Sequence, residues 1–129
     1  MTKSTSFFRK FQFLPEQVER NLRNAQNDLK IAGRISLPSV RFTYSYTALI
    51  KGGIALLSCV QLKVRSVPGH QSMIIEHLAE VMGDRTIADQ DFYGGGILMT
   101  DKDSREYLRF VERVLNEIEL RIKQHLRCQ

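Results

Sequence analysis

The sequence has little cysteine and no long uninterrupted hydrophobic run. Its two cysteines, Cys59 and Cys128, lie far apart in a chain of 129 residues, which is not the spacing of a disulfide framework. Lys51 interrupts the most apolar stretch, which therefore falls short of the roughly 20 apolar residues that a membrane span needs. The N-terminal phenylalanines are separated by polar and basic residues, so the apolar region of a signal peptide is missing. We expect a soluble, cytoplasmic protein with no membrane contact.

Motifs of the common catalytic and metal sites are also missing. No glycine-rich phosphate loop follows a predicted strand, and the chain has neither a Gly-x-Ser-x-Gly nor a Cys-x-x-Cys motif. His70 and His77 share a helix face with two glutamates nearby, but carboxylate-bridged metal bundles use Glu-x-x-His pairs on two helices, and no such pair occurs. We therefore predict no metal site and no cofactor. We interpret residues 94–96, three glycines, as a flexible connection within a loop and not as a phosphate-binding loop.

Positive charge is concentrated in the first half of the chain. The formal net charge is +5, and residues 1–70 carry eleven Lys/Arg against three Asp/Glu, whereas residues 71–104 carry two against seven. A basic half is compatible with an anionic partner, for which nucleic acid is the usual candidate. It is equally compatible with attraction between the two halves, or with plain solubility.

The most apolar stretch, Ser39 to Leu62, is predicted to be the central helix. Arg41 and Lys51 are its only formal charges, and its apolar residues recur at helical spacing without sustained alternation. Its length also favours a helix, because an unbroken strand of this length would be far outside the usual range. Gly52 and Gly53 each cost about 1 kcal/mol relative to Ala in a helix interior. We interpret them as positions that a neighbouring helix approaches closely, with a ligand against the bare backbone as the alternative.

Three further helices are predicted from apolar spacing and from start and stop signals, over residues 15–33, over residues 70–81, and from a capping box at Thr100 and Asp103 onward. Residues 84–99 are predicted to form a long loop. The pattern predicts an all-α fold, an up-and-down antiparallel four-helix bundle in a single domain of residues 15–129, with no confident strand. An aromatic segment, residues 1–14, precedes it. Its four phenylalanines are expected to cover one end of the bundle or to dock on another subunit.

Four short pieces of sequence occur in a suggestive order. They are Pro15-Glu16-Gln17-Val18-Glu19 leading to Asn27-Asp28-Leu29, then Ser45-Tyr46-Thr47-Ala48-Leu49-Ile50-Lys51, then Gly69-His70, then Arg85 with Asp91-Phe92-Tyr93-Gly94. In this order they resemble the HEPN superfamily of prokaryotic nucleotide-associated helical domains, over roughly residues 15–125. The resemblance implies a bundle that often dimerises, in toxin–antitoxin, phage-defence or RNA-processing settings. Active members are metal-independent endoribonucleases that use an Arg followed, after four to six residues, by a His.

Arg65 and His70 have the spacing that the resemblance requires. The pairing is chemically sensible, because a guanidinium stabilises phosphate charge and an imidazole moves protons near neutral pH. In the family, however, the catalytic pair lies near the start of the last helical unit. This chain has Arg85 there, followed by Gln90, Asp91 and Phe92 where a His would stand.

The sequence therefore supports several hypotheses about function. The first is a non-catalytic HEPN-like binding module, a homodimer that engages RNA, nucleotide or a protein partner such as a nucleotidyltransferase through Arg85, Asp91, Tyr93 and the basic first half. The alternative is an endoribonuclease that uses Arg65 and His70, and a helical scaffold subunit is a third. We expect any binding of nucleic acid to be weak and mostly electrostatic, because basic residues are spread over several elements and aromatics are not interleaved with them.

Overall fold

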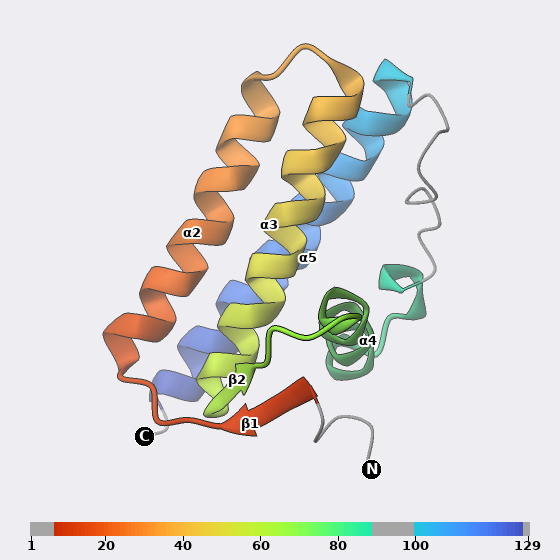
Figure 1. The fold of residues 1–129 in the computed structure, drawn as a ribbon. Helices are drawn as coiled ribbons and strands as arrows, with labels where there is room; N and C mark the ends of the chain where they lie inside the picture. The colour runs from red at the N-terminus through yellow and green to blue at the C-terminus, as the bar shows by residue number, and fades with distance from the viewer. Residues whose placement is uncertain (1–6, 89–99, 128–129) are drawn as a thin grey trace.

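The computed structural model describes residues 7–88 and 100–127, and this part of the chain is mostly helical (Figure 1). Its elements, in chain order, are β1 (Phe8–Lys10), α2 (Pro15–Arg34), α3 (Pro38–Cys59), β2 (Leu62–Val64), α4 (His70–Met82), the 3-10 turn η1 (Arg85–Ile87) and α5 (Asp101–Arg127). The four predicted helices are therefore present. No helix in the described ranges is long and apolar enough to cross a membrane.

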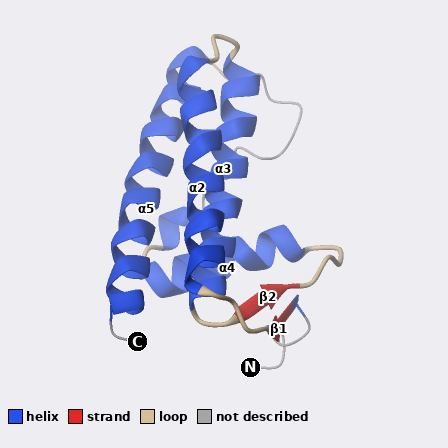
Figure 2. Ribbon diagram, turned by 90° about the vertical axis from the view of Figure 1, so that its left-hand side faces the viewer, coloured by secondary structure: helices blue, strands red, loops and turns tan. Residues whose placement is uncertain are grey.

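Three of the helices lie side by side, and the fourth does not join them. In Figure 1, α2 runs upward while α3 and α5 run downward, and Figure 2 shows the short α4 lying crosswise beside the lower part of the three, where it packs against α3. In the predicted up-and-down bundle, α4, as the third helix in the chain, would run parallel to α2. In the structure it lies crosswise instead. At 13 residues α4 is too short to span its 20- to 27-residue neighbours, and the chain reaches it through a turn at Gly69, whose φ is +84°.

The N-terminal turns of α2 and α5 follow from local sequence. Pro15 occupies the first turn of α2, and the Gln17 side chain turns back to accept a hydrogen bond from the Leu14 N–H at 2.7 Å. At the start of α5, the Thr100 Oγ1 accepts a hydrogen bond from the Asp103 N–H at 3.0 Å, which confirms the predicted start of that helix. Both helices bury a single apolar stripe, as their sequence periodicity predicts.

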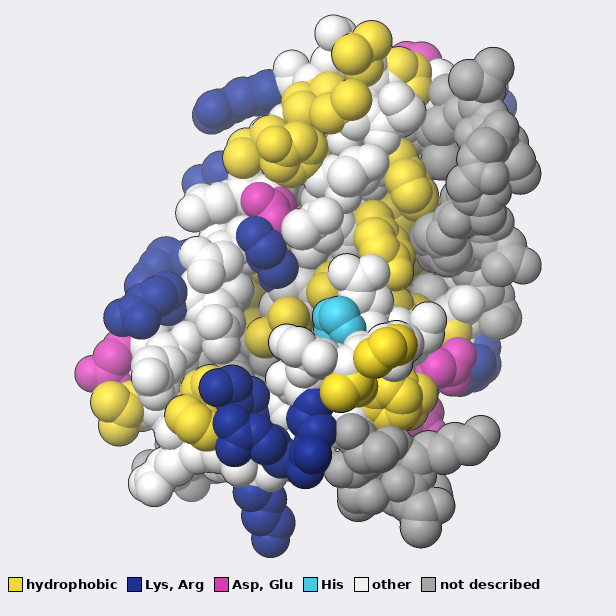
Figure 3. Space-filling model, in the orientation of Figure 1, with side chains coloured by type: hydrophobic (Ala, Val, Ile, Leu, Met, Phe, Trp, Pro, Cys, Tyr) yellow, Lys and Arg dark blue, Asp and Glu magenta, His cyan; other side chains and the backbone are white. Residues whose placement is uncertain are grey.

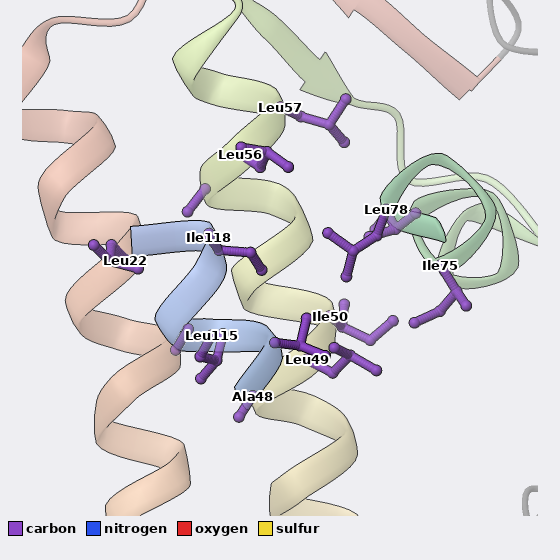
Figure 4. Close-up of a cluster of buried hydrophobic side chains, with 14 of the residues drawn as sticks. Leu22, Ala48, Leu49, Ile50, Leu56, Leu57, Ile75, Leu78, Leu115 and Ile118 are labelled. Atoms are coloured by element: carbon purple, nitrogen blue, oxygen red, sulfur yellow. The ribbon is translucent and has the colours of Figure 1, made fainter. Parts of the chain in front are cut away.

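Helix α3 is central because the other helices pack against it on several sides (Figure 4). A Cβ atom added at Gly52 would overlap the Leu115 side chain of α5, and one added at Gly53 would overlap the Ile74 side chain of α4. The prediction that neighbouring helices approach these two glycines closely is confirmed. The first turn of α3 is held to α5 by the buried Arg41, whose guanidinium donates to Asp101 at 2.7 Å.

Two short strands are present that the sequence pattern did not predict. Strands β1 and β2 pair antiparallel, with Phe8 opposite Val64 and Lys10 opposite Leu62. Helix α3 ends at Cys59, three residues before the predicted end, because the chain reverses at Gln61 in a left-handed conformation with φ of 63°. A three-residue strand is too short for a period of two to be detected, and its partner lies more than fifty residues away. The strand also decides where part of the aromatic segment goes, since Phe8 is buried in the core.

Candidate nucleic-acid interface

The β1–β2 ribbon presents one face to solvent and one to the core. Side chains alternate across a strand, so Phe8 and Val64 point inward while the opposed pair Arg9 and Lys63 points outward. The ladder extends by one pair at each end, because the Arg65 N–H donates to the Phe7 carbonyl at 2.7 Å and the Phe11 N–H donates to the Gln61 carbonyl at 3.1 Å. We call the exposed, outward residues the basic ribbon face: Arg9, Phe11, Lys63 and Arg65.

Three cations on this face form no ion pair within the described ranges. Arg9, Lys63 and Arg65 are exposed, and none forms an ion pair with a described residue. Arg9 and Lys63 stand directly opposite each other, an arrangement of like charges that destabilises a strand pair. An anion bound across the pair would relieve this repulsion. Figure 3 shows Lys and Arg side chains gathered at the end of the molecule where the ribbon lies.

Phe11 lies among these cations. The Lys63 Nζ is 4.7 Å from the centroid of the Phe11 ring, and the Arg9 guanidinium carbon is 5.7 Å from it. The ring of Phe13 packs beside it, with centroids 4.8 Å apart and planes tilted by 52°. Phe11 nevertheless keeps 36% of its surface exposed. The expectation that aromatic residues are not interleaved with the basic ones is therefore wrong for this face.

Gln61 fixes the position of the aromatic segment. It is the one described residue other than glycine with a positive φ, a conformation that costs a side-chain-bearing residue about 1–2 kcal/mol. Its side-chain Oε1 accepts a hydrogen bond from the Phe13 N–H at 2.6 Å, and its Nε2 donates to the Phe13 carbonyl at 3.4 Å. A groove of about 780 Å³ lies along this contact, lined by residues 10–13 and 60–62.

Arg65 stands at the end of the ribbon and His70 is the first residue of α4, and the hollow beside His70 is not lined by Arg65. His70 lines a hollow of about 430 Å³ together with Tyr46 and residues 66–72, and Arg65 is not among its lining residues. The His70 Nδ1 is 2.9 Å from the Val67 carbonyl oxygen. A carbonyl can only accept, so Nδ1 carries the proton, and the basic nitrogen of neutral His70 is Nε2.

The second predicted site is only partly described. Arg85 lies in η1, and its guanidinium donates two hydrogen bonds to the Glu76 carboxylate of α4, at 3.0 and 3.3 Å. The negative charge of Glu76 offsets the positive charge of Arg85 that would otherwise attract a phosphate. Asp91 and Tyr93, together with Gln90 and Phe92, lie outside the described residues. Within the described ranges, no group of three or more His, Cys, Asp or Glu residues could hold a metal ion.

The basic ribbon face could not be predicted from the sequence, because its residues come from two distant segments. One local signal was available: Leu62-Lys63-Val64-Arg65 alternates apolar and basic residues with the period of a strand. A four-residue alternation does not by itself outweigh the helical pattern that precedes it. The partner strand, and therefore the approach of Phe11 to Lys63, is a tertiary feature that no local pattern contains.

No family model matches this sequence, and searches of curated proteins and of solved structures also returned no match. The resemblance to HEPN domains therefore stays a prediction that rests on the four sequence pieces alone.

Proposed function

We propose that this protein is a non-catalytic module that binds nucleic acid, with RNA as the ligand expected from the sequence, through the basic ribbon face. The observation that carries the proposal is the opposed pair Arg9 and Lys63. These two exposed cations form no ion pair with a described residue, and they lie next to the exposed aromatic ring of Phe11. Phosphate contacts from Lys and Arg supply most of the affinity of such interfaces, and each contact releases counterions.

The proposal is tested by fluorescence anisotropy of the purified chain with a labelled 20-nucleotide RNA over a salt series. We expect log affinity to fall linearly with log salt, by roughly 0.7 for each phosphate contact with a single strand. The double variant Arg9→Gln/Lys63→Gln removes two such contacts, so its salt slope is expected to be shallower by roughly 1 to 2.

A matched control removes the same charge elsewhere. Arg23 and Lys30 are exposed on α2, and neither forms an ion pair with a described residue. The variant Arg23→Gln/Lys30→Gln should bind RNA with nearly the affinity and salt slope of wild type. Equal losses in the two double variants would show that net charge alone attracts the RNA, and would reject the ribbon as the interface.

An endoribonuclease that uses Arg65 and His70 is a second candidate. One observation favours it: the Val67 carbonyl holds the imidazole of His70 in the tautomer whose Nε2 can take up a proton. Arg65 is not among the residues that line the hollow beside His70, which argues against it.

Cleavage of a mixed RNA pool by wild type, Arg65→Ala, His70→Ala and Arg85→Ala separates the two candidates. We expect no efficient cleavage by any of them, because no His follows Arg85 at the positions where the family resemblance would place it. Without a His as general acid and base, the cleavage rate is typically lower by about 10²- to 10⁴-fold. Robust cleavage by wild type that His70→Ala abolishes would falsify the non-catalytic proposal and place the active site at the turn before α4.

A further inference from the structure

We infer that the ligand of the basic ribbon face is a single-stranded nucleic acid, one of whose bases stacks on Phe11 while Arg9 and Lys63 hold adjacent phosphates. The inference rests on the proposed function and specifies the class of ligand that the same face binds. It goes beyond charge attraction, because it assigns an aromatic contact to a base.

The arrangement of ring and cations matches the chemistry of a nucleotide. A nucleotide carries a flat apolar base and a phosphate within one short unit, and Phe11 lies within 6 Å of two cationic groups on the same face. In a duplex the base faces are hidden in the stack, so a protein ring can reach only unstacked bases. A partly exposed phenylalanine beside paired cations therefore favours a single strand over a duplex.

Lys63 covers the Phe11 ring in the free protein, and a base can displace it. An exposed contact between an ammonium and a ring is weaker than a base stacked on that ring. The displaced ammonium would move to the incoming phosphate, with which it forms a stronger, charge-assisted hydrogen bond.

The ring is also held ready for this contact. Gln61 fixes the backbone of Phe13 through two hydrogen bonds, and Phe13 supports Phe11 from the side. The groove beside them, about 780 Å³, is within the size range of ligand sites and is lined by polar as well as aromatic residues. A ring that is fixed before binding loses little conformational entropy when the ligand arrives.

The chain contains no tryptophan, so Phe11→Trp introduces a single tryptophan at the proposed stacking position, and its fluorescence can be excited selectively over that of the four tyrosines. We expect quenching of its fluorescence by oligothymidylate and by oligouridylate, and little quenching by an abasic strand of the same length or by a duplex. The RNA and DNA strands together show which sugar is preferred. Equal quenching by the abasic strand would overturn the inference, because it would mean that no base reaches the ring.

Affinity measurements provide a second test. Phe11→Leu keeps an apolar side chain but removes the ring, and should weaken single-strand binding by about 5- to 160-fold while leaving abasic-strand binding and the salt slope unchanged. Phe11→Tyr keeps the ring and should bind as wild type does. Melting temperatures of the three proteins check that each is folded.

The outcomes separate this inference from the proposed function. If Arg9→Gln/Lys63→Gln weakens binding but Phe11→Leu does not, the ribbon binds a polyanion without stacking and the inference fails alone. If wild type binds no strand of any kind, both fail. Binding to phosphatidylserine vesicles that depends on Phe11, with no preference for strands that carry bases, would reject nucleic acid and assign the face to a membrane surface.

Discussion

Gln61 shows at the scale of a single residue how the ribbon is held in place. Its left-handed backbone reverses the chain after α3 and directs its side chain to the backbone of Phe13. Any side chain pays the conformational cost of this position, but only a side chain with both a donor and an acceptor can satisfy Phe13. We therefore explain the presence of glutamine at position 61 by its two hydrogen bonds to Phe13 and not by its backbone preference.

Two substitutions at Gln61 separate these contributions. Gln61→Ala loses the hydrogen bonds and keeps the backbone strain, whereas Gln61→Gly loses the hydrogen bonds and relieves the strain. We expect both variants to be less stable than wild type, and Gln61→Ala to be less stable than Gln61→Gly by about 1 kcal/mol in urea unfolding. The reverse order would mean that the positive φ is not retained in solution.

The helices, considered as elements, are held together by close approach at α3. Gly53 leaves room for Ile74 of α4, so Gly53→Ala should destabilise the protein by about 1–3 kcal/mol through overpacking. Gly33, in the last turn of α2, has open space around its Cα and no positive φ. Gly33→Ala should be neutral or stabilising by about 0.4–1 kcal/mol. Urea denaturation of the two variants checks the opposite signs, and a loss of stability at both glycines would contradict the packing shown here.

Strand β1 docks on α4 through an aromatic contact with a histidine. The Phe8 ring meets the His77 ring edge-on with centroids 5.5 Å apart. Burial lowers the pKa of His77 below its ordinary value of 6.5, while the Glu80 carboxylate works in the opposite direction. The folded state therefore holds His77 neutral at pH values where the unfolded chain binds a proton. The stability that neutral His77 contributes is complete above pH 6.5 and is lost as the pH falls below it.

This contact gives a measurable pH dependence. Wild type should lose more thermal stability than His77→Gln when the pH is lowered from about 7.5 to about 5.5, since only wild type carries the shifted imidazole. Melting curves followed by circular dichroism at each pH give the comparison. Parallel losses in the two proteins would show that His77 does not contribute to the dependence.

At the scale of the whole molecule, the end opposite the ribbon carries an exposed aliphatic patch. The turn between α2 and α3 and the helix ends beside it expose three aliphatic side chains, with Leu37 63% exposed, Ile31 38% and Val40 36%. The homodimer predicted from the sequence stays a prediction, and this aliphatic end offers a surface through which it could form.

Light scattering on the purified chain decides the oligomeric state. We expect the mass of a dimer at micromolar concentration, and we expect Leu37→Glu to give a monomer because it places a charge in the apolar patch. Leu120, on α5, is also exposed, at 56%, so Leu120→Glu serves as the control and should remain a dimer. A monomeric mass for wild type would refute the prediction.

Sequence alone determined the helices, because each is specified by residues that are close together in the chain. Pro15, the Thr100 capping box and the two apolar stripes set the limits of α2 and the start of α5 within a residue of the observed positions. Gly52 and Gly53 also signalled close packing correctly. The caps and stripes are local signals that agree with the global fold, so they can be recognised along the sequence.

Tertiary structure decided how α4 lies and where the candidate interface forms. The strand pairing joins residues 8–10 to residues 62–64, and only that pairing places Arg9 opposite Lys63 and brings Phe11 beside both. In the same way, the buried Arg41 finds Asp101 sixty residues later, and the Arg41 and Arg105 side chains hold the pKa of Asp101 below its usual value. Side-chain period and propensity describe neighbours along the chain, whereas these contacts depend on which distant backbone satisfies which hydrogen bond.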